Sequence, residues 1–562
     1  MEIQGHSTLR RAEIPDTEPR EGIPPEIDVL IVGYGPVGAA IANLLGRFGV
    51  RVLAVDKDKE IFMAPRAIAL DNEALRILQM AGLEDGDFDK VAIPYVRMVS
   101  PQLGEFGRIN SLGQIDGHPK LVTFYQPQLE AALRRRALEH GSVQTALGVS
   151  LASFVERDDA VIATLDTGDG RTASVRARYL IGADGASSLV RQLIGQAFTG
   201  QTYAEDWLVV DARGAERPID HIEFICDYRR PVPHMTAPGG RERWEFMLRP
   251  GETRAEMEGD AKIRELLAPW GGPAAMTIER KAVYRFHART AKAFSKGRVF
   301  LAGDAAHITP PFVGQGLVAG LRDAANLSWK IAWVLHGRAA TAILDSYDVE
   351  RRPHAKAMID LAKFMGRLIM PRSATVALLV HGTLRLTRLT AAMRRYFDEL
   401  GIKPKNVFAR GLFAPKRSGA KLGRGGPLPQ GWVRGPDGAV RRSDEALGPA
   451  LTLVGFGCDP AEPVDAASLA AFQACGGRVV QFSHRGQTRP LHRERCWEDL
   501  DGTFLPGAAP LGWAAVVRPD RTVLHDGPAR EADRLVRESL ALLGSPIRAE
   551  AAYAAAPAAM TA

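Results

Sequence analysis

The pattern of apolar and polar residues predicts a βαβ unit near the start of the chain. Residues 28–32 form an almost continuous apolar run, which is typical of a buried strand. Apolar side chains then recur with a period of about 3.6 residues between Val37 and Phe48, so we expect a helix that ends at Gly49. A second apolar run at 51–55 ends at Asp56. The chain therefore begins as strand, helix, strand.

Later patterns predict two further kinds of structure. Asp71 is placed to cap a short helix, and Gln126-Pro127 opens another. Residues 151–180 alternate as three strands of a meander. Alternating runs between 201 and 285 predict an antiparallel sheet that forms a separate lobe, with its aromatic residues mostly on a covered face.

The end of the chain has its own order of elements. After a Gly/Pro/Lys-rich segment near 415–429, the predicted order is βαβ…ββα, which is that of a thioredoxin core. The cysteines Cys226, Cys458, Cys475 and Cys496 form no CxxC pair. We therefore expect a structural role for this unit, in packing or dimerisation, and neither a disulfide scaffold nor a metal site.

Composition and charge narrow the class of protein. A chain of 562 residues with 46% hydrophobic and 24% charged residues is typical of a soluble protein of two or three domains. No apolar run is long enough for a transmembrane helix, and residues 1–26 lack the apolar core of a signal peptide, so we expect a flexible tail and a cytoplasmic location. The net charge of +7 forms no basic block, which disfavours nucleic-acid binding and suits anionic small molecules.

The strongest chemical signal is the motif Gly33-x-Gly35-x-x-Gly38 between the first strand and its helix. Gly33 allows a tight turn, Gly35 lets the backbone approach a pyrophosphate, and Gly38 lets the helix lie close to the sheet. Asp56 is placed to accept hydrogen bonds from an adenosine ribose. A glycine turn beside a chance acidic residue is the alternative, and it leaves the agreement among these features unexplained.

Two further turns end buried strands. One is Gly182-Ala-Asp184-Gly185, and the other delivers Asp304 to a loop that enters a helix at Gly314-Gln315-Gly316. The N–H groups of that helix start are placed to hold an electron-rich part of a cofactor. His307 fits a structural role better than a catalytic one, because no nucleophile is nearby in sequence. Arg66 fits a cofactor contact and a solvated loop charge equally well.

Together the three motifs resemble the fingerprints of the class A, single-component flavoprotein aromatic hydroxylases. Further segments resemble the phenol hydroxylase branch: Pro65-Arg66-Ala67-Ile68, Gln126-Pro127-Gln128, Leu344-Asp345-x-Tyr347-x-x-Glu350-Arg351-Arg352 and Arg518-Pro519-Asp520-Arg521. The resemblance implies an α/β fold, with a Rossmann-like FAD-binding domain, an inserted antiparallel-sheet substrate domain and a C-terminal thioredoxin-like domain. The expected division is a tail at 1–26, the FAD-binding domain at 27–97, 120–200 and 282–370, the substrate domain at 98–119 and 201–281, a helical segment and linker at 371–449, the thioredoxin-like domain at 450–548 and a disordered tail at 549–562.

The resemblance also implies an activity. Such enzymes use FAD, NADH or NADPH, and O2 to hydroxylate a phenol ortho to its hydroxyl through a flavin C4a-hydroperoxide. Segments such as Arg243-Trp244-Glu245-Phe246-Met247 narrow the similarity to enzymes acting on hydroxylated arylpropionates such as 3-(3-hydroxyphenyl)propionate. A larger polycyclic phenol as substrate, a flavin dehydrogenase or oxidase, and a non-catalytic flavoprotein stay open as alternatives.

The resemblance assigns roles to individual residues. The expected cofactor-binding residues are Gly33, Gly35, Pro36, Val37, Gly38, Asp56, Lys57, Arg66, Gln126, Asp184, Gly303, Asp304, Pro311, Gly314, Gln315, Gly316, Leu317 and Val318. Val318 departs from the family, which commonly has Asn in this segment. Arg241, Arg243 and Phe246 are candidate substrate contacts. No catalytic side chain is assigned, because the flavin carries the difficult step.

Overall fold

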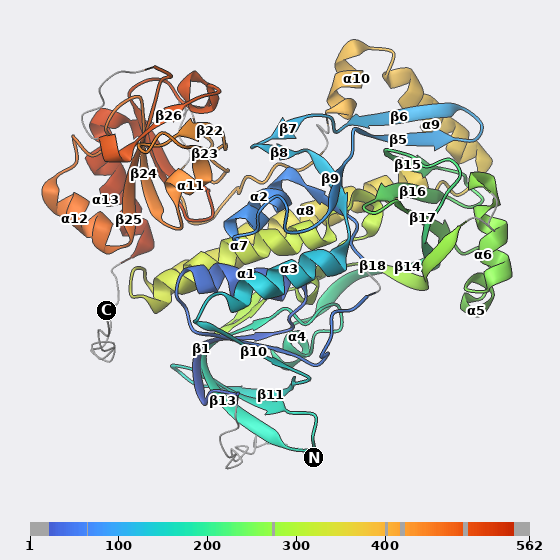
Figure 1. Ribbon diagram of the computed structural model, residues 1–562, viewed down its shortest axis with the longest axis horizontal. Helices are drawn as coiled ribbons and strands as arrows, with labels where there is room; N and C mark the ends of the chain where they lie inside the picture. The colour runs from blue at the N-terminus through green and yellow to red at the C-terminus, as the bar shows by residue number, and fades with distance from the viewer. Residues whose placement is uncertain are drawn as a thin grey trace, which may run out of the picture.

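The computed structural model describes residues 22–63, 66–271, 276–399, 403–415, 422–486 and 493–544. The expected tail at 1–26 lies almost wholly outside the described residues, and the expected tail at 549–562 lies wholly outside them. Figure 1 shows three assemblies: a first sheet covered by long helices, a second sheet beside it, and a C-terminal unit on the other side. Within the described ranges, every helix is too short or too polar to span a bilayer.

The first sheet has the order β10-β2-β1-β13-β12-β11, with β20 beside β13 and β19 beside β20. β1 pairs in parallel with β2 and β13, and the predicted meander β11-β12-β13 is antiparallel. The strands are β1 Glu26–Val32, β2 Val52–Asp56, β10 Val143–Leu147, β11 Ser150–Glu156, β12 Val161–Asp166, β13 Thr172–Gly182, β19 Ser295–Lys296 and β20 Val299–Leu301. The predicted βαβ start is confirmed.

Helices pack on this sheet and on one another. α1 (Pro36–Arg47) contacts both α3 (Gln126–Leu138) and α7 (Gly316–Leu335), as Figure 1 shows. The expected cap is present, because the Ala74 N–H donates to Asp71 Oδ1 over 2.9 Å. The smaller elements are β3 Ala69–Asp71, α2 Asn72–Met80, β4 Lys90–Ala92, β7 Gln114–Ile115, β8 His118–Pro119, β9 Leu121–Phe124 and α4 Leu189–Leu193. The next helix, α8 (Ser346–Ile369), runs from this part toward the second sheet.

The second sheet has the order β21-β18-β14-β17-β16-β15-β5-β6. All its pairs are antiparallel except β15 with β5. Its strands are β5 Tyr95–Ser100, β6 Gly104–Asn110, β14 Phe198–Arg213, β15 Ile222–Ile225, β16 Val232–Ala237, β17 Arg241–Met247, β18 Thr277–Ala291 and β21 His307–Ile308. The expected domain divisions at 97/98 and 281/282 fall inside β5 and β18, so both strands belong whole to this sheet.

One face of the second sheet is covered by helices, and the other face lines a cavity. Trp244 and Phe246 pack with residues of α5 (Arg254–Met257) and α6 (Asp260–Leu267), including Met257 and Leu267. The opposite face lines the cavity described below. Trp244 and Phe246 thus belong to the core, whereas Phe224, Tyr284 and Phe286 of the same sheet line the cavity.

The C-terminal unit is a seven-stranded sheet with the order β23-β22-β26-β25-β24-β27-β28. It begins earlier than residue 450, because β22 pairs with β26. Its elements are β22 Trp432–Arg434, β23 Val440–Arg442, α11 Ser443–Leu447, β24 Leu451–Phe456, α12 Ala466–Ala474, β25 Gly477–Ser483, β26 Cys496–Asp499, β27 Trp513–Val517, β28 Val523–Pro528 and α13 Ala532–Leu543. The predicted helical segment contains α9 (Ala374–Thr387) and α10 (Ala391–Asp398), which contact β6.

Candidate active site

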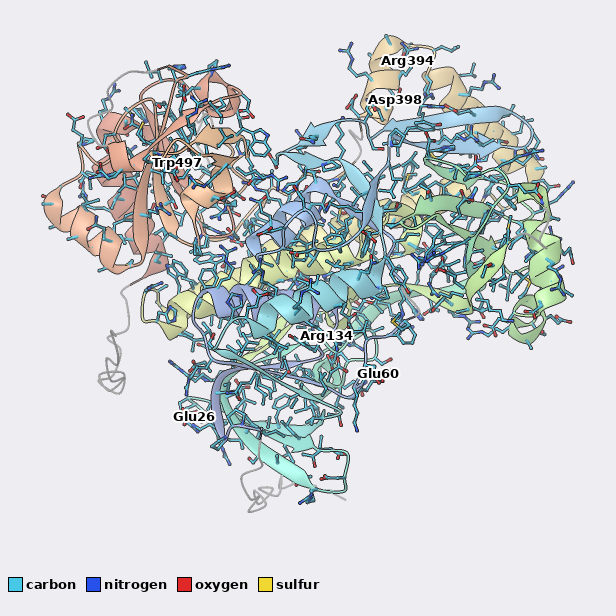
Figure 2. All side chains as sticks on the ribbon, in the orientation of Figure 1. Glu26, Glu60, Arg134, Arg394, Asp398 and Trp497 are labelled. Atoms are coloured by element: carbon cyan, nitrogen blue, oxygen red, sulfur yellow. The ribbon has the colours of Figure 1, made fainter. Side chains whose placement is uncertain are left out.

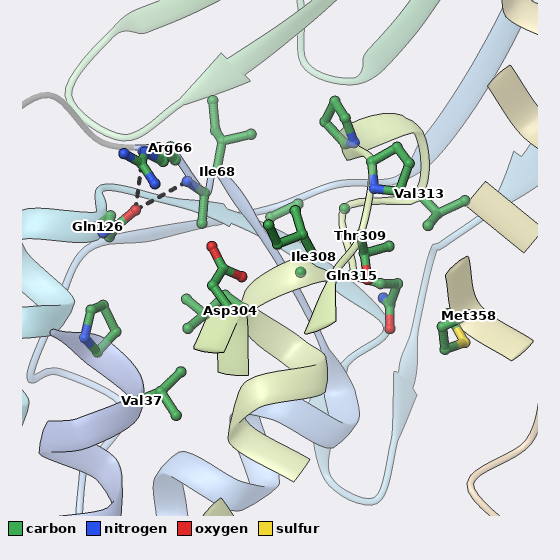
Figure 3. Close-up of a pocket in the computed structure, with 18 of the residues that line it drawn as sticks. Val37, Arg66, Ile68, Gln126, Asp304, Ile308, Thr309, Val313, Gln315 and Met358 are labelled. Carbon is green, nitrogen blue, oxygen red and sulfur yellow. Dashed lines mark hydrogen bonds between the residues drawn. The ribbon is translucent and has the colours of Figure 1, made fainter. Parts of the chain in front are cut away.

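A continuous cavity of about 1610 Å³ lies between the first sheet and the second. Ligand pockets usually measure roughly 300–1,000 Å³, so this cavity has room for more than one small molecule. One end is lined by the glycine turn after β1, and the other by the second sheet and α8. Figure 3 shows the middle of the cavity, where Asp304 and Gln315 point into it.

The three glycines of the motif have different roles. A Cβ on Gly33, whose φ is +97°, would lie 2.4 Å from the Ala183 carbonyl oxygen, and a Cβ on Gly38 would lie 2.0 Å from the Gly33 carbonyl oxygen. A Cβ on Gly35 would meet nothing within 4 Å. Gly33 and Gly38 therefore permit close packing, whereas Gly35 leaves space open at the N-terminus of α1, where N–H groups attract phosphate.

Acidic and basic side chains flank this turn. Asp56 accepts hydrogen bonds from the N–H groups of Tyr34 (2.7 Å) and Asp58 (2.9 Å), which hold its carboxylate at the end of β2. Arg134 on α3 donates to the Tyr34 carbonyl oxygen (3.0 Å) and lies beside the same end of the cavity (Figure 2). No local sequence pattern marks Arg134, because its proximity to the turn arises from the packing of α3 on α1.

A loop at Arg66 closes one side of the cavity. The side-chain oxygen of Gln126 accepts the N–H groups of Arg66 (3.1 Å) and Ala67 (3.0 Å), as Figure 3 shows for Arg66. From the second sheet, Arg243 Nη1 donates to the Arg66 carbonyl oxygen over 3.0 Å. The loop is thus held in place by hydrogen bonds to both α3 and β17.

Two carboxyl groups in the cavity wall have oxygen atoms without a hydrogen-bond donor among the described residues. Asp184 Oδ1 is buried with no hydrogen-bond partner among the described residues, although Oδ2 accepts the Val190 N–H over 3.1 Å. Within the same ranges the Asp304 carboxylate accepts no hydrogen bond, and Figure 3 shows it pointing into the cavity. Burial raises the pKa of both groups. Buried carboxyl groups require partners, so these two fit the hydroxyl groups of a bound ribityl or ribose chain.

The start of α7 forms the wall opposite Arg66. Gly314 adopts a φ of +61°, and a loop of Pro311, Gly314, Gln315, Gly316 and Leu317 leads into the 20-residue helix. Gln315 Nε2 donates to Asp71 Oδ2 over 3.1 Å, which fixes the loop. The free N–H groups at this helix start are placed to bind the oxygen atoms of a flavin ring. Together with the Gly35 opening and the unpartnered carboxyl groups, this wall fits FAD.

Most of the predicted cofactor residues come together around this cavity. Those that line it are Gly33, Gly35, Pro36, Val37, Asp56, Lys57, Arg66, Gln126, Asp184, Asp304, Pro311, Gly314, Gln315, Gly316 and Leu317. Gly38, Gly303 and Val318 lie behind the lining. Gly303 provides close packing, because a Cβ there would lie 3.1 Å from Val37 Cγ2, and Val318 is fully buried in the core.

None of the candidate substrate contacts Arg241, Arg243 and Phe246 lines the cavity. Alternation along β17 turns Phe246 to the covered face, where it packs with Trp270. Arg243 Nε pairs with Asp211 Oδ1 over 2.6 Å, and Arg241 pairs with Glu279. The side chains that do line this end were missed: Val209, Phe224, Met235, Glu245, Arg280, Tyr284 and Phe286 of the second sheet, and Met358, Leu361 and Met365 of α8.

Comparison with known proteins identifies the class. The family described as FAD binding domain matches residues 26–362, which is more than half of the chain, and the HcaD C-terminal domain family matches residues 425–542. The fold is similar to that of the flavin-dependent monooxygenase PieE, solved with FAD and substrate (TM-score 0.77, 22% identity, 93% of this chain and 99% of that one). The chain therefore belongs to the FAD-binding class A flavoprotein aromatic hydroxylases, and the resemblance in the sequence is confirmed.

Two other proteins are more similar to this chain in sequence than PieE is. A 3-(3-hydroxy-phenyl)propionate/3-hydroxycinnamic acid hydroxylase of Burkholderia vietnamiensis is 36% identical over 508 residues, which cover 88% of this chain and 92% of the relative. A hydroxylase of the same name from Escherichia coli is 35% identical over 522 residues, which cover 91% and 93%.

We expect Asp304→Ala to weaken FAD binding. The carboxylate faces the cavity without a protein donor, so its hydrogen bonds to the cofactor are lost in the variant, at a cost of about 1–3 kcal/mol. The measurement is the dissociation constant of FAD from apoprotein, followed by flavin fluorescence. Asp304→Asn, which keeps an oxygen acceptor, should lose less. An unchanged dissociation constant in Asp304→Ala would refute this role.

Proposed function

We propose that this protein is an NAD(P)H- and O2-dependent monooxygenase that hydroxylates a phenol ortho to its hydroxyl group. The observation that carries the proposal is the shape of the cavity: a dinucleotide cradle at Gly35 and Asp56 opens directly into an apolar compartment under the second sheet. FAD, when bound, supplies the oxygen chemistry. The residues of the chain position the two molecules and keep water out of the compartment.

The composition of the compartment supports an aromatic substrate. Side chains such as Phe224, Phe286 and Met365 provide an apolar wall, and Arg280 and Arg285 of the second sheet also line the cavity. A ring with a short carboxylate tail matches this mixture. Together with the names of the relatives, it favours 3-(3-hydroxyphenyl)propionate or a close arylpropionate.

A screen of phenols tests this function. The purified, FAD-loaded protein is mixed with NADH or NADPH and with 3-(3-hydroxyphenyl)propionate, simple phenols and larger polycyclic phenols. We expect the arylpropionate to accelerate NAD(P)H oxidation and to yield a catechol in stoichiometric amount. If only a larger phenol is hydroxylated, the assigned substrate is wrong and the monooxygenase class stands. If oxidation occurs without any hydroxylated product, the protein is a flavin dehydrogenase or oxidase.

We also infer finer points of organisation. The second sheet, including the whole of β5 and β18, is the substrate domain inserted in the FAD-binding domain. The C-terminal unit is thioredoxin-like, and the strand order β25-β24-β27-β28 followed by α13 supports this. Burial raises the pKa of Cys458, Cys475 and Cys496, which supports a structural and non-redox role for that unit. Because the reaction consumes NAD(P)H, we place the enzyme in the cytoplasm.

A further inference from the structure

Glu245 occupies the middle of the sheet face that lines the cavity. On β17 it is paired with Val209 of β14, and Val209 is paired with Ala282 of β18. Successive residues of a strand point to opposite faces, so Glu245 shares its face with Arg243 and is opposite to Trp244 and Phe246. The side chains of Val209 and Glu245 both line the cavity. The carboxyl group of Glu245 therefore faces the compartment that we assign to the substrate.

The surroundings of Glu245 leave its carboxyl group without a partner. The residue is 7% exposed, and in the described part of the chain it accepts no hydrogen bond and forms no ion pair. The neighbouring arginines make their short ion pairs with another carboxylate, because Asp211 pairs with both Arg243 (2.6 Å) and Arg280 (3.3 Å). Arg280 Nη2 also donates to the Tyr284 hydroxyl over 2.6 Å. A buried carboxyl group of this kind requires a donor from the ligand.

β18 lines this space with the polar pair Arg280 and Tyr284, whereas the side chains contributed by β15, β16, β5 and α8 are apolar. These are Phe224 of β15, Pro233 and Met235 of β16, Val96 and Met98 of β5, and Met358, Leu361 and Met365 of α8. An aromatic ring would lie among these groups with its edge toward Glu245. In this setting one polar group can orient a ligand that is otherwise held by apolar contact.

We propose that Glu245 binds the phenolic hydroxyl of the substrate and accepts its proton during hydroxylation. In this step the phenolic O–H bond breaks, an O–H bond forms on Glu245 Oε, and the electron pair stays on the phenolic oxygen, which enriches the ring for attack on the oxygen donor. The inference rests on the proposed function. A purely structural role is disfavoured because, within the described residues, Glu245 makes no hydrogen bond or ion pair and interacts with Arg243 and Arg280 only at longer range.

The electrostatics of the site set a pH dependence. Burial raises the pKa of Glu245, and the nearby negative charge of Asp211 adds to this effect, while Arg243 and Arg280 oppose it. A base must be deprotonated to accept a proton, so the function of Glu245 is present above this raised pKa and is lost as pH falls through it. The pH at which the hydroxylation rate falls on the acidic side should therefore lie above the usual pKa range of glutamate.

The test compares Glu245→Gln with Glu279→Gln. Glutamine keeps the shape of the side chain but accepts no proton, and Glu279 is an exposed acidic residue of β18 that pairs with Arg213 and Arg241 and does not line the cavity. Each variant is loaded with FAD, and hydroxylation of 3-(3-hydroxyphenyl)propionate is measured in single turnovers between pH 5.5 and 9. We expect Glu245→Gln to be slower at neutral pH by about 10²- to 10⁴-fold and to lose the acidic limb, with Glu279→Gln close to the wild type.

A binding comparison distinguishes failure of the inference about Glu245 from failure of the proposed function. The wild type should bind the phenol more tightly than its 3-methoxy ether, which has no proton to donate, and Glu245→Gln should lose that preference. If the wild type hydroxylates the phenol and Glu245→Gln matches it in rate, pH profile and preference, the inference fails and the proposed function stands. If the wild type hydroxylates no phenol, the proposed function fails and the inference fails with it.

The wild type alone also decides the matter if the glutamine variant does not hold FAD. Its preference for the phenol over the methoxy ether should decline as pH falls through the raised pKa of Glu245. Glu245→Asp, which keeps the carboxylate but shortens its reach, should retain the acidic limb at a reduced rate. A preference that does not change with pH would overturn the inference.

Discussion

Gly35→Val should abolish FAD binding while the protein still folds. Gly35 has ordinary extended backbone angles (φ −70°, ψ −172°), and its Cβ would meet no protein atom within 4 Å, so valine adds no strain. The branched side chain would instead fill the space before the N-terminus of α1. Crowding of roughly 1–3 kcal/mol, together with about 1.5–3 kcal/mol for a lost charge-assisted hydrogen bond to phosphate, predicts affinity that is lower by about 100-fold or more.

The measurement has two parts. The flavin absorbance of purified protein reports FAD content, and far-UV circular dichroism with thermal unfolding of the apoproteins reports folding. The matched control is Gly86→Val, because Gly86 is exposed, lies away from the cavity and also has no atom within 4 Å of its Cβ. We expect Gly86→Val to retain FAD. A yellow Gly35→Val protein with normal FAD affinity would show that the cofactor does not approach this turn.

Gly38, the third glycine of the motif, gives the opposite expectation for folding. A Cβ on Gly38 would lie 2.0 Å from the Gly33 carbonyl oxygen, so Gly38→Ala must displace α1 from β1. That variant should be deficient in folded protein as well as in FAD. The contrast between the two variants distinguishes a glycine that serves the ligand from one that serves the fold, a distinction that the motif alone does not make.

The cradle was predictable because its signals are local in sequence. The positive φ of Gly33 and the cap at Asp71 are marked by residues within a few positions, and Asp56 ends an apolar run, although its Tyr34 partner is 22 residues away. The same holds for the helix start at Gly316. Local sequence determines such features, so the sequence identified most of the side chains that line the cofactor end of the cavity.

The substrate end was not predictable in the same way. Alternation places Arg243 and Glu245 on one face of β17 and Phe246 on the other, but which face meets the cavity depends on where α5 and α6 pack. The start of the C-terminal unit was missed for a related reason. β22 and β23 have three residues each, and β22 gains its place by pairing with β26, more than 60 residues later. Long-range pairing of this kind leaves little trace in a short apolar pattern.

The second large effect is expected from Arg518→Met, which removes a buried link between the C-terminal unit and α8. Glu350 on α8 accepts hydrogen bonds from Arg518 Nη1 (2.7 Å), Lys330 Nζ (2.8 Å) and the Leu412 N–H (2.7 Å), and all three charged side chains are fully buried. Breaking a buried ion pair by removing one partner costs about 3–5 kcal/mol, because the remaining charges lose their compensation.

The link also bears on the active site, because α8 carries Met358, Leu361 and Met365 into the cavity wall. We therefore expect Arg518→Met to lower the urea concentration at which FAD is released as well as that at which the helices unfold. Flavin fluorescence and far-UV circular dichroism measure the two transitions. Arg537→Ala, which removes an exposed pair with Asp533, is the control and should change stability by less than about 1 kcal/mol.

The same cluster predicts how stability depends on pH. Burial alone would raise the pKa of Glu350, but Arg518 and Lys330 outweigh it and hold that pKa well below its usual range. A carboxyl group with a lowered pKa contributes stability above its unfolded pKa of about 4.3, and this contribution is lost as pH falls further. Arg518→Met should therefore lose less stability than the wild type between pH 5 and pH 3. Equal losses in both proteins, or an unfolding midpoint in the variant equal to that of the wild type at neutral pH, would show that the Arg518–Glu350 pair does not hold the C-terminal unit to α8.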